Sequence, residues 1–268
     1  MGNVKMGRPT VRDLLNLKGV RQLTEVLVRT EEEATACEEA GIDLLITVAG
    51  EQARKIRAAA PNTFLTMGLL YGDCASPTEA VRAGFAALKD GADAVYACMS
   101  IPFIAAMAQE GIPVVGHVGL VPQKRTWTGG FQAVGKTAAE ALSVYEATLA
   151  HQEAGAFAVE MEVVPEQVAE AISKRTEMLV ISMGSGKGCD AQYLFAEDIL
   201  GTNRGHVPRH AKVYRNLAGE LDRIQRERVQ AFREYQADVL KGTFPDTKNT
   251  VGVKSEEYDE FLRKLPPI

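Results

Sequence analysis

Eight short apolar runs recur between residues 21 and 196, and helix-like segments fill six of the seven intervals between them. Most runs are continuous stretches of β-branched and aliphatic residues, which is typical of parallel strands buried on both faces. We expect strands at 21–28, 43–49, 63–69, 93–99, 112–118, 156–162, 177–183 and 193–196. We expect helices at 31–40, 50–59, 77–90, 101–109, 137–154 and 165–174.

Glycines separate these segments at regular points. Gly41, Gly91 and Gly111 each close a helix-like segment and precede an apolar run, as glycines at helix C-termini do. Eight parallel strands joined by helices form a (β/α)8 TIM barrel, a fold of about 250 residues. We assign residues 1–206 to this barrel. A doubly wound open sheet has the same alternation, but no GxGxxG sequence of the dinucleotide-binding kind follows the first run.

The C-terminal part carries a different pattern. Residues 207–241 place apolar side chains on roughly one helical face, at Leu217, Leu221, Ile224, Val229, Phe232, Tyr235 and Val239. We predict one long amphipathic helix there, packed on the barrel or on a neighbouring subunit, and hence a homo-oligomer. Residues 242–268 are polar, with prolines near both ends, and we interpret them as a surface tail of a single-domain chain.

Composition excludes several classes of partner. The net charge of −5 argues against nucleic acid and anionic membranes as partners, which leaves a small-molecule substrate. The four cysteines form no CxxC pair, as is usual in a reducing compartment. No run of 18 apolar residues and no signal-peptide core is present, so we expect a cytoplasmic protein.

Ionisable residues end two neighbouring runs, and barrel enzymes keep their chemistry at the carboxyl ends of strands. His117 ends the fifth run, within Gly-His-Val-Gly-Leu-Val-Pro-Gln at 116–123. Glu160 and Glu162 end the sixth run, and alternation sends both to one face. A carboxylate beside an apolar pocket has a raised pKa and can serve as a general base. A structural histidine and a salt bridge at the barrel rim are the alternatives.

Two glycine-containing loops follow these strands. Residues 183–190, Met-Gly-Ser-Gly-Lys-Gly-Cys-Asp, could turn backbone N–H groups toward an anion, so we assign Gly184 and Ser185 to substrate binding. A tight turn is the other interpretation. Residues 123–136 hold three glycines and the single tryptophan, a composition that suits a mobile cover over a pocket or a rigid surface loop.

Longer motifs extend over almost the whole chain. In chain order they are 10–19, 116–123, Gly129-Gly130-Phe131, 154–165, 183–201, and Tyr235 with Phe244-Pro245. Together they resemble the ketopantoate hydroxymethyltransferase family, whose members are (β/α)8 barrels of the phosphoenolpyruvate mutase type. The resemblance implies Mg2+-dependent transfer of a hydroxymethyl group from methylenetetrahydrofolate to 2-oxoisovalerate in pantothenate biosynthesis.

The resemblance also implies roles for single residues. Glu162 matches the family's general base, which removes the proton next to the ketone, and His117 matches its substrate-contacting histidine. Gly50 and Tyr96 stand where the family has substrate contacts after the second strand and on the fourth. The family motif implies no role for Glu160, and we assign it to substrate binding from its position beside Glu162.

The first half of the chain departs from the family at the metal. Ala49, Gly68 and Cys98 replace the metal-side carboxylates expected on the second, third and fourth strands, and Tyr96 replaces a lysine. The family positions therefore supply no metal ligand, although Asp73 lies a little beyond Gly68. Without Mg2+, the enolate requires another source of charge stabilisation.

Three hypotheses remain open from the sequence. The chain performs the family reaction with a rearranged metal site, and then also needs methylenetetrahydrofolate as co-substrate. Alternatively, it is a metal-independent lyase, isomerase or aldolase acting on a small carbonyl compound, with Glu162 as base and His117 or Tyr96 as acid. The third hypothesis is a catalytically silent barrel that binds a ligand or supports an assembly.

Overall fold

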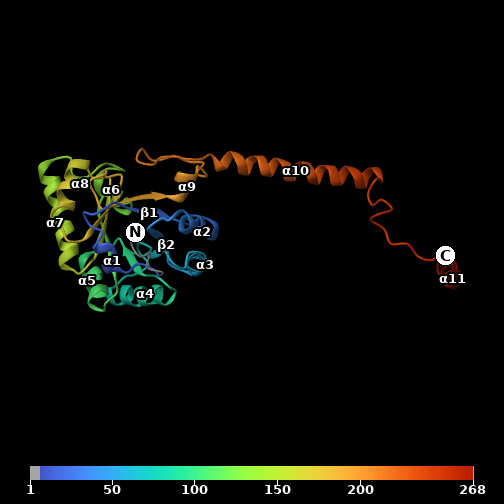
Figure 1. The fold of residues 1–268 in the computed structure, drawn as a ribbon, viewed down its shortest axis with the longest axis horizontal. Helices are drawn as coiled ribbons and strands as arrows, with labels where there is room; N and C mark the ends of the chain where they lie inside the picture. The colour runs from blue at the N-terminus through green and yellow to red at the C-terminus, as the bar shows by residue number, and fades with distance from the viewer. Residues whose placement is uncertain (1–6, 268) are drawn as a thin grey trace, which may run out of the picture. The chain divides into compact units, whose positions relative to one another are not determined.

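The computed structural model describes residues 7–267 and contains a closed barrel of eight parallel strands (Figure 1). The order around the barrel is that of the chain, and β8 pairs with β1 to close it. This confirms the predicted TIM barrel and excludes the open sheet. Each strand overlaps one of the predicted runs: β1 Leu23–Leu27, β2 Leu44–Val48, β3 Phe64–Leu69, β4 Ala94–Ala97, β5 Val114–Gly119, β6 Ala158–Glu162, β7 Leu179–Met183 and β8 Ala191–Phe195.

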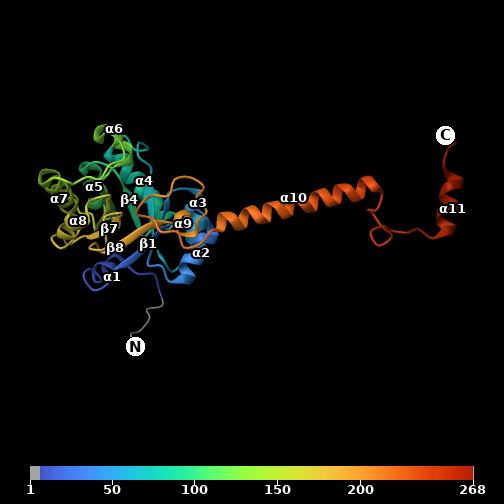
Figure 2. The same ribbon diagram turned by 90° about the horizontal axis from the view of Figure 1, so that it is seen from above.

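Six helices lie outside the strands, at the six predicted places (Figures 1 and 2). They are α2 Glu31–Ala40, α3 Glu51–Ala59, α4 Pro77–Lys89, α5 Ile101–Gln109, α7 Ala138–Glu153 and α8 Glu166–Ser173. Thr30, Ser76 and Thr137 begin α2, α4 and α7, and each hydroxyl oxygen accepts a hydrogen bond from the backbone N–H three residues later. Such N-caps satisfy backbone donors that have no partner within the helix.

Four short helical turns were not predicted. They are α1 Val11–Leu15, the 3-10 turn η1 Pro122–Lys124, α6 Arg125–Thr128 and α9 Ala196–Leu200. Each spans about one helical turn, too short for a 3.6-residue period to appear in the sequence. Two of them, η1 and α6, lie in the glycine-containing segment that was expected to be a loop at 123–136.

The barrel interior changes character along its strands. Leu23, Ala94, Val115 and Ala158 are buried apolar residues near the amino ends of their strands. Two positions further on, where alternation returns to the same face, stand Glu25, Tyr96, His117 and Glu160. Apolar packing therefore fills one end of the interior, and ionisable groups occupy the next layer toward the carboxyl ends.

The C-terminal part differs from the prediction. The chain forms two compact units, up to Arg215 and from Asn216; the assignment of the whole chain to a single domain stays a prediction. In the second unit, α10 runs from Leu217 to Lys241 and therefore starts later than the predicted 207. Pro208 interrupts the earlier segment, and the Asn216 side chain accepts a hydrogen bond from the N–H of Gly219 to begin the helix.

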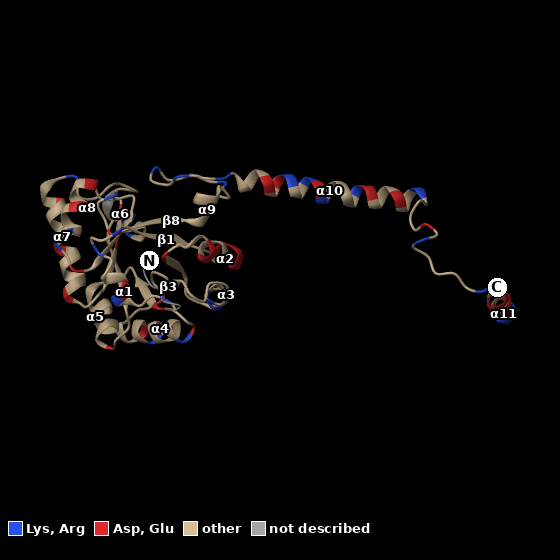
Figure 3. Cartoon of the chain, in the orientation of Figure 1, with Lys and Arg blue, Asp and Glu red and all other residues tan. Residues whose placement is uncertain are grey.

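Within its own unit, α10 buries none of its residues. Acidic and basic side chains are interspersed along it (Figure 3), and the predicted apolar positions are exposed, Phe232 by 73%. The segment predicted as a polar tail contains a further helix, α11 Ser255–Lys264. None of the helices within residues 7–267 combines the length and apolar character needed to cross a bilayer.

Gly116 on β5 lets α7 pack closely against the barrel. A Cβ atom added there would lie 2.2 Å from Cδ2 of the buried His151 ring. We therefore expect Gly116→Ala to lower the free energy of unfolding by about 2 kcal/mol through overpacking, measured by urea denaturation. Gly7→Ala, where an added Cβ meets nothing within 4 Å, is the control. The double variant Gly116→Ala/His151→Ala should recover part of the loss, and strictly additive effects would contradict this explanation.

Candidate active site

A cavity of about 210 Å3 opens at the carboxyl ends of the strands. Its wall is largely apolar, with residues such as Leu27, Ile46 and Met183. Tyr96 of β4, Glu160 and Glu162 of β6 and Tyr193 of β8 bring ionisable groups to it; Cys98 also lines it. This is the end of a TIM barrel where βα loops build active sites.

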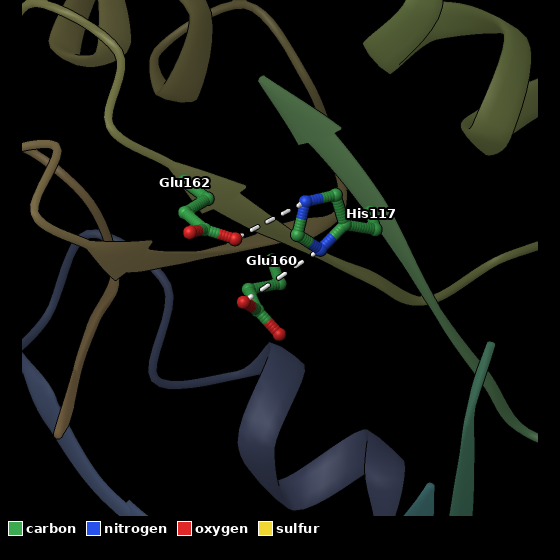
Figure 4. A group of neighbouring side chains, drawn as sticks. All are labelled: His117, Glu160 and Glu162. Atoms are coloured by element: carbon green, nitrogen blue, oxygen red, sulfur yellow. Dashed lines mark ion pairs between the residues drawn. The ribbon is translucent and has the colours of Figure 1, made fainter. Parts of the chain in front are cut away.

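The His117 ring lies between two carboxylates (Figure 4). Its Nδ1 is 3.6 Å from Oε1 of Glu160, and its Nε2 is 3.6 Å from Oε2 of Glu162. His117 and Glu160 are register partners on β5 and β6, and Glu162 follows two residues later on the same face. Each carboxylate therefore faces a different ring nitrogen, at a distance too long for a direct hydrogen bond.

Shorter contacts fix the protonation of this ring. Nε2 lies 2.6 Å from the backbone oxygen of Leu120, and because a carbonyl only accepts, the proton is on Nε2. Nδ1 then accepts from the Tyr96 hydroxyl at 2.8 Å. Burial lowers the pKa of His117 to about 4, so the ring is neutral at physiological pH. His117 holds the Tyr96 hydroxyl in place and carries no charge.

The Leu120 contact is itself anchored to β6. The Leu120 N–H donates to the backbone oxygen of Glu162 at 2.9 Å. Gly119, at φ 89°, makes this approach possible, because an added Cβ would lie 2.3 Å from the same oxygen. The carbonyl that sets the histidine tautomer therefore stays in register with the strand that carries Glu162.

Three buried carboxylates share the barrel interior. Glu25, Glu160 and Glu162 are 4%, 5% and 9% exposed, and no ion pair with lysine or arginine involves them among the described residues. Burial raises the pKa of Glu25 to about 8 and that of Glu162 to about 7. The pKa of Glu160 is raised well above its usual range by burial and then by the charges of Glu162 and Glu25. Such groups cannot all be ionised together at neutral pH.

The structure brings together part of the predicted site. Tyr96, Glu160 and Glu162 line the cavity, while His117 lies behind Tyr96 and is not among the lining residues described. Gly50 and Ala49 line a different cavity of about 380 Å3, together with Asp73. Both cavities share Gly68.

In the loop after β7, the Ser185 hydroxyl forms its hydrogen bonds with backbone atoms. Ser185 is fully buried, and its hydroxyl donates to the backbone oxygen of Met161 at 2.8 Å and accepts from the N–H of Val164 at 2.9 Å. These bonds tie the loop to the end of β6, and Ser185 is not among the residues that line the cavity at the barrel mouth. Gly184 lines an outer cavity of about 500 Å3, where an added Cβ would lie 2.9 Å from Nδ1 of His210.

The outer cavity also borders Glu162. Phe131, Phe195 and Pro208 give it apolar surface, and Arg209 gives it a basic group. Glu162 lines the cavity at the barrel mouth as well, so the two cavities adjoin at this residue.

Two residues of the site were missed by the sequence reasoning. Glu25 and Tyr193 are register partners on β1 and β8, and both are buried inside the barrel. Glu25 is the charged residue in the middle of an otherwise apolar run, a signal like the one used for Glu160. Nothing comparable marks Tyr193, because tyrosine is common in strands.

The positions at which the resemblance places the Mg2+ ligands do not fit that ion. Ala49, Gly68 and Cys98 offer a methyl group, a hydrogen atom and a thiol whose pKa is raised by burial to about 11. Mg2+ requires oxygen ligands in octahedral geometry. None of the three supplies one from its side chain, so no step is assigned to an ion at these positions.

A second set of donors lies on β5 and β6. His117, Glu160 and Glu162 each offer one donor atom within 4.8 Å of the others, a spacing that could hold a metal ion; it is the one such cluster among the described residues. The histidine does not present a free lone pair, because Nε2 donates to Leu120 and Nδ1 accepts from Tyr96. An ion using Nδ1 would have to displace the Tyr96 hydroxyl.

A closed (β/α)8 barrel with buried carboxylates at the carboxyl ends of its strands defines the class of barrel enzymes. A family model described as ketopantoate hydroxymethyltransferase matches residues 34–247. The 3-methyl-2-oxobutanoate hydroxymethyltransferase of Deinococcus radiodurans is 37% identical over 214 residues, 78% of this chain and 73% of the relative. The Kosmotoga olearia enzyme of the same name is 30% identical over 274 residues, 93% and 99% of the two chains. The chain belongs to the ketopantoate hydroxymethyltransferase family, as its motifs predicted.

Solved structures support the fold. A 2,3-dimethylmalate lyase, a member of the PEP mutase/isocitrate lyase superfamily, superposes with a TM-score of 0.53 at 14% identity, over 94% of this chain and 95% of that one. A phosphonopyruvate hydrolase complex with oxalate and Mg++ gives a TM-score of 0.54 at 12% identity, over 95% and 97%. At these identities the likeness concerns the barrel alone.

Replacing Glu25 should stabilise the barrel in a pH-dependent way. Its pKa is about 8 in the folded chain against an ordinary value of 4.5, so the wild type loses stability as pH rises from about 4.5 to 8. Glu25→Gln stays neutral, and we expect it to gain on the order of 3 kcal/mol at pH 8 and little at pH 4.5. Thermal unfolding across this range measures the effect. The exposed Glu39→Gln is the control, and an equal gain at both pH values would contradict the explanation.

Proposed function

We propose that this chain catalyses proton abstraction next to the carbonyl group of a small compound, followed by formation or cleavage of a carbon–carbon bond. The observation that carries the proposal is the Glu162 carboxylate. It lines both cavities, accepts no hydrogen bond from the described side chains, and has a pKa raised by burial to about 7. A general base works best with a pKa near the operating pH.

The chemistry follows from the groups around the cavity. The Glu162 carboxylate takes a proton from the carbon next to the carbonyl, and the C–H electron pair becomes the C=C bond of an enolate. Negative charge then develops on the carbonyl oxygen. Burial and the charges of Glu162 and Glu25 raise the pKa of Glu160 well above its usual range, which favours the protonated form, and in that form its O–H can donate to this oxygen. His117 acts through Tyr96, whose hydroxyl it orients beside Glu160.

Hydrogen exchange with solvent tests the base. In D2O, a substrate found by screening small ketones, aldehydes and 2-oxo acids should lose the NMR signal of the hydrogen next to its carbonyl when the protein is added. Glu162→Gln should slow this exchange by at least about 100-fold, whereas Glu153→Gln, on the exposed surface of α7, should not change it. The rate should rise with pH and level off above about 7, because the ionised form of Glu162 is the active one. Full exchange by Glu162→Gln would contradict the proposal.

A second candidate function keeps the family reaction. It is favoured by the family match and by the spacing of His117, Glu160 and Glu162, which would hold a divalent cation in place of the family ligands. Methylenetetrahydrofolate would then be the co-substrate and 3-methyl-2-oxobutanoate the acceptor. Turnover that requires Mg2+ would establish this candidate, and absence of any exchange or turnover would favour a ligand-binding barrel.

We also propose that the chain is a homo-oligomer and resides in the cytoplasm. The exposed apolar residues of α10 support the first proposal, and four free cysteines support the second. Light scattering should give a mass that is a multiple of 29.0 kDa, and Phe232→Glu should reduce it. Gln230→Glu, at a polar position of α10, is the control. A wild-type mass of one chain would contradict the oligomer.

A further inference from the structure

The charge at the barrel mouth constrains the ligand. The cavity of about 210 Å3 is lined by two carboxylates, Glu160 and Glu162, and no lysine or arginine appears among its described lining residues. A third carboxylate, Glu25, lies buried within electrostatic range of Glu160. His117 behind the wall is neutral, since its Nε2 proton is given to a carbonyl and its Nδ1 accepts from Tyr96. The space where Glu162 meets its substrate therefore has negative or neutral walls.

The nearest basic side chains do not change this. Lys124 is exposed in η1, and its influence reaches Cys98 and His117 without the side chain lining the cavity. Arg29 pairs with Glu197 at 3.7 Å. Arg209 lines the outer cavity and not the inner one. A carboxylate on the reacting molecule would thus be buried beside Glu162 without a cationic partner.

Such burial is unfavourable for an anion. A carboxylate that leaves water needs a paired charge or several hydrogen bonds to replace its hydration. Here it would instead face Glu162 in the ionised form that the base requires, and like charges at close range in a partly buried site repel. An uncharged carbonyl compound meets neither obstacle, and the apolar wall of Leu27, Ile46 and Met183 suits its alkyl groups.

We infer that the molecule deprotonated by Glu162 is an uncharged carbonyl compound, such as a small ketone, aldehyde or ester, and not a 2-oxo acid anion. The inference rests on the proposed function for the identity of the base. It goes beyond that function in naming the substrate class. The alternative is an anion whose charge is bridged to the carboxylates by a metal ion.

A matched pair of probes separates these outcomes. The compounds 3-methyl-2-butanone and 3-methyl-2-oxobutanoate have the same branched alkyl ketone and differ in a methyl group against a carboxylate. Deuterium exchange at the branched carbon is measured for each, with EDTA and with Mg2+, and divided by the buffer-catalysed rate. We expect the ketone to be favoured at least tenfold in kcat/KM under both conditions. Preference for the anion, with or without Mg2+, would overturn the inference.

Binding distinguishes failure of this inference from failure of the proposed base. Ligand-observed NMR gives affinities for both probes without any turnover. Wild type should bind the ketone more tightly than the anion, and Glu162→Gln should improve binding of the anion at least about tenfold while leaving the ketone unchanged. If exchange is absent but these affinities hold, the base assignment fails and the substrate class stands. Tighter binding of the anion by wild type, or no binding of the ketone, would refute the substrate class.

A variant can also reverse the preference. Leu70 lines the cavity and is 53% exposed, so a longer polar side chain can be placed there without disturbing the buried core. Leu70→Lys should raise the relative affinity of the anion at least about fivefold by supplying the missing positive charge. Leu70→Gln, which adds polarity without charge, should leave the ratio of the two affinities as it is. An equal shift in both variants would count against a charge effect.

Discussion

Closure of the barrel by the pairing of β8 with β1 determines what the interior can do. The pairing places Glu25 beside Tyr193, although 168 positions separate them in the sequence, and brings the Glu25 charge within range of Glu160 on β6. Three carboxylates then share one desolvated space with no described lysine or arginine as partner. Their raised pKa values follow from that arrangement.

The neutral His117 ring lies next to two of these carboxylates. Each of its ring nitrogens faces one of the two carboxylates, Glu160 and Glu162, and the two nitrogens are hydrogen-bonded to Tyr96 and to the Leu120 carbonyl. The motif around His117 resembles that of the family, and by the same resemblance Ala49, Gly68 and Cys98 stand where carboxylates are expected at β2, β3 and β4. In the proposed reaction Glu162 is the base and Glu160 is the hydrogen-bond donor, in a site where the expected metal-ligand positions carry no carboxylate. The residues that resemble the family motif therefore lie on β5 and β6, and the residues that depart from it lie at β2, β3 and β4.

Local pattern was enough to predict the barrel and the place of Glu162 at the end of a strand. Eight apolar runs and their glycine-terminated helices identified the strands, and Glu162 was found from its motif and its place at a strand end. The partners of these residues could not be predicted, because they depend on register around a closed sheet. Glu25 meets Glu160 across the interior, and the Ser185 hydroxyl turns to the backbone of β6. One-turn helices such as α9 were not predicted because they are too short to show a helical period. The start of α10 at Leu217 was not predicted because it depends on a single proline, Pro208, and on the Asn216 cap.

The position of Glu162 where two cavities adjoin gives the proposed reaction a stereochemical consequence. A planar enolate formed in the inner cavity has one face toward the carboxylate that deprotonated it, and the outer cavity opens beside that same carboxylate. A second reactant arriving from the outer cavity would attack the face from which the proton departed. The new carbon–carbon bond would then replace the C–H bond with retention of configuration, and the handedness of the product would be set by the one strand, β6, that carries the base.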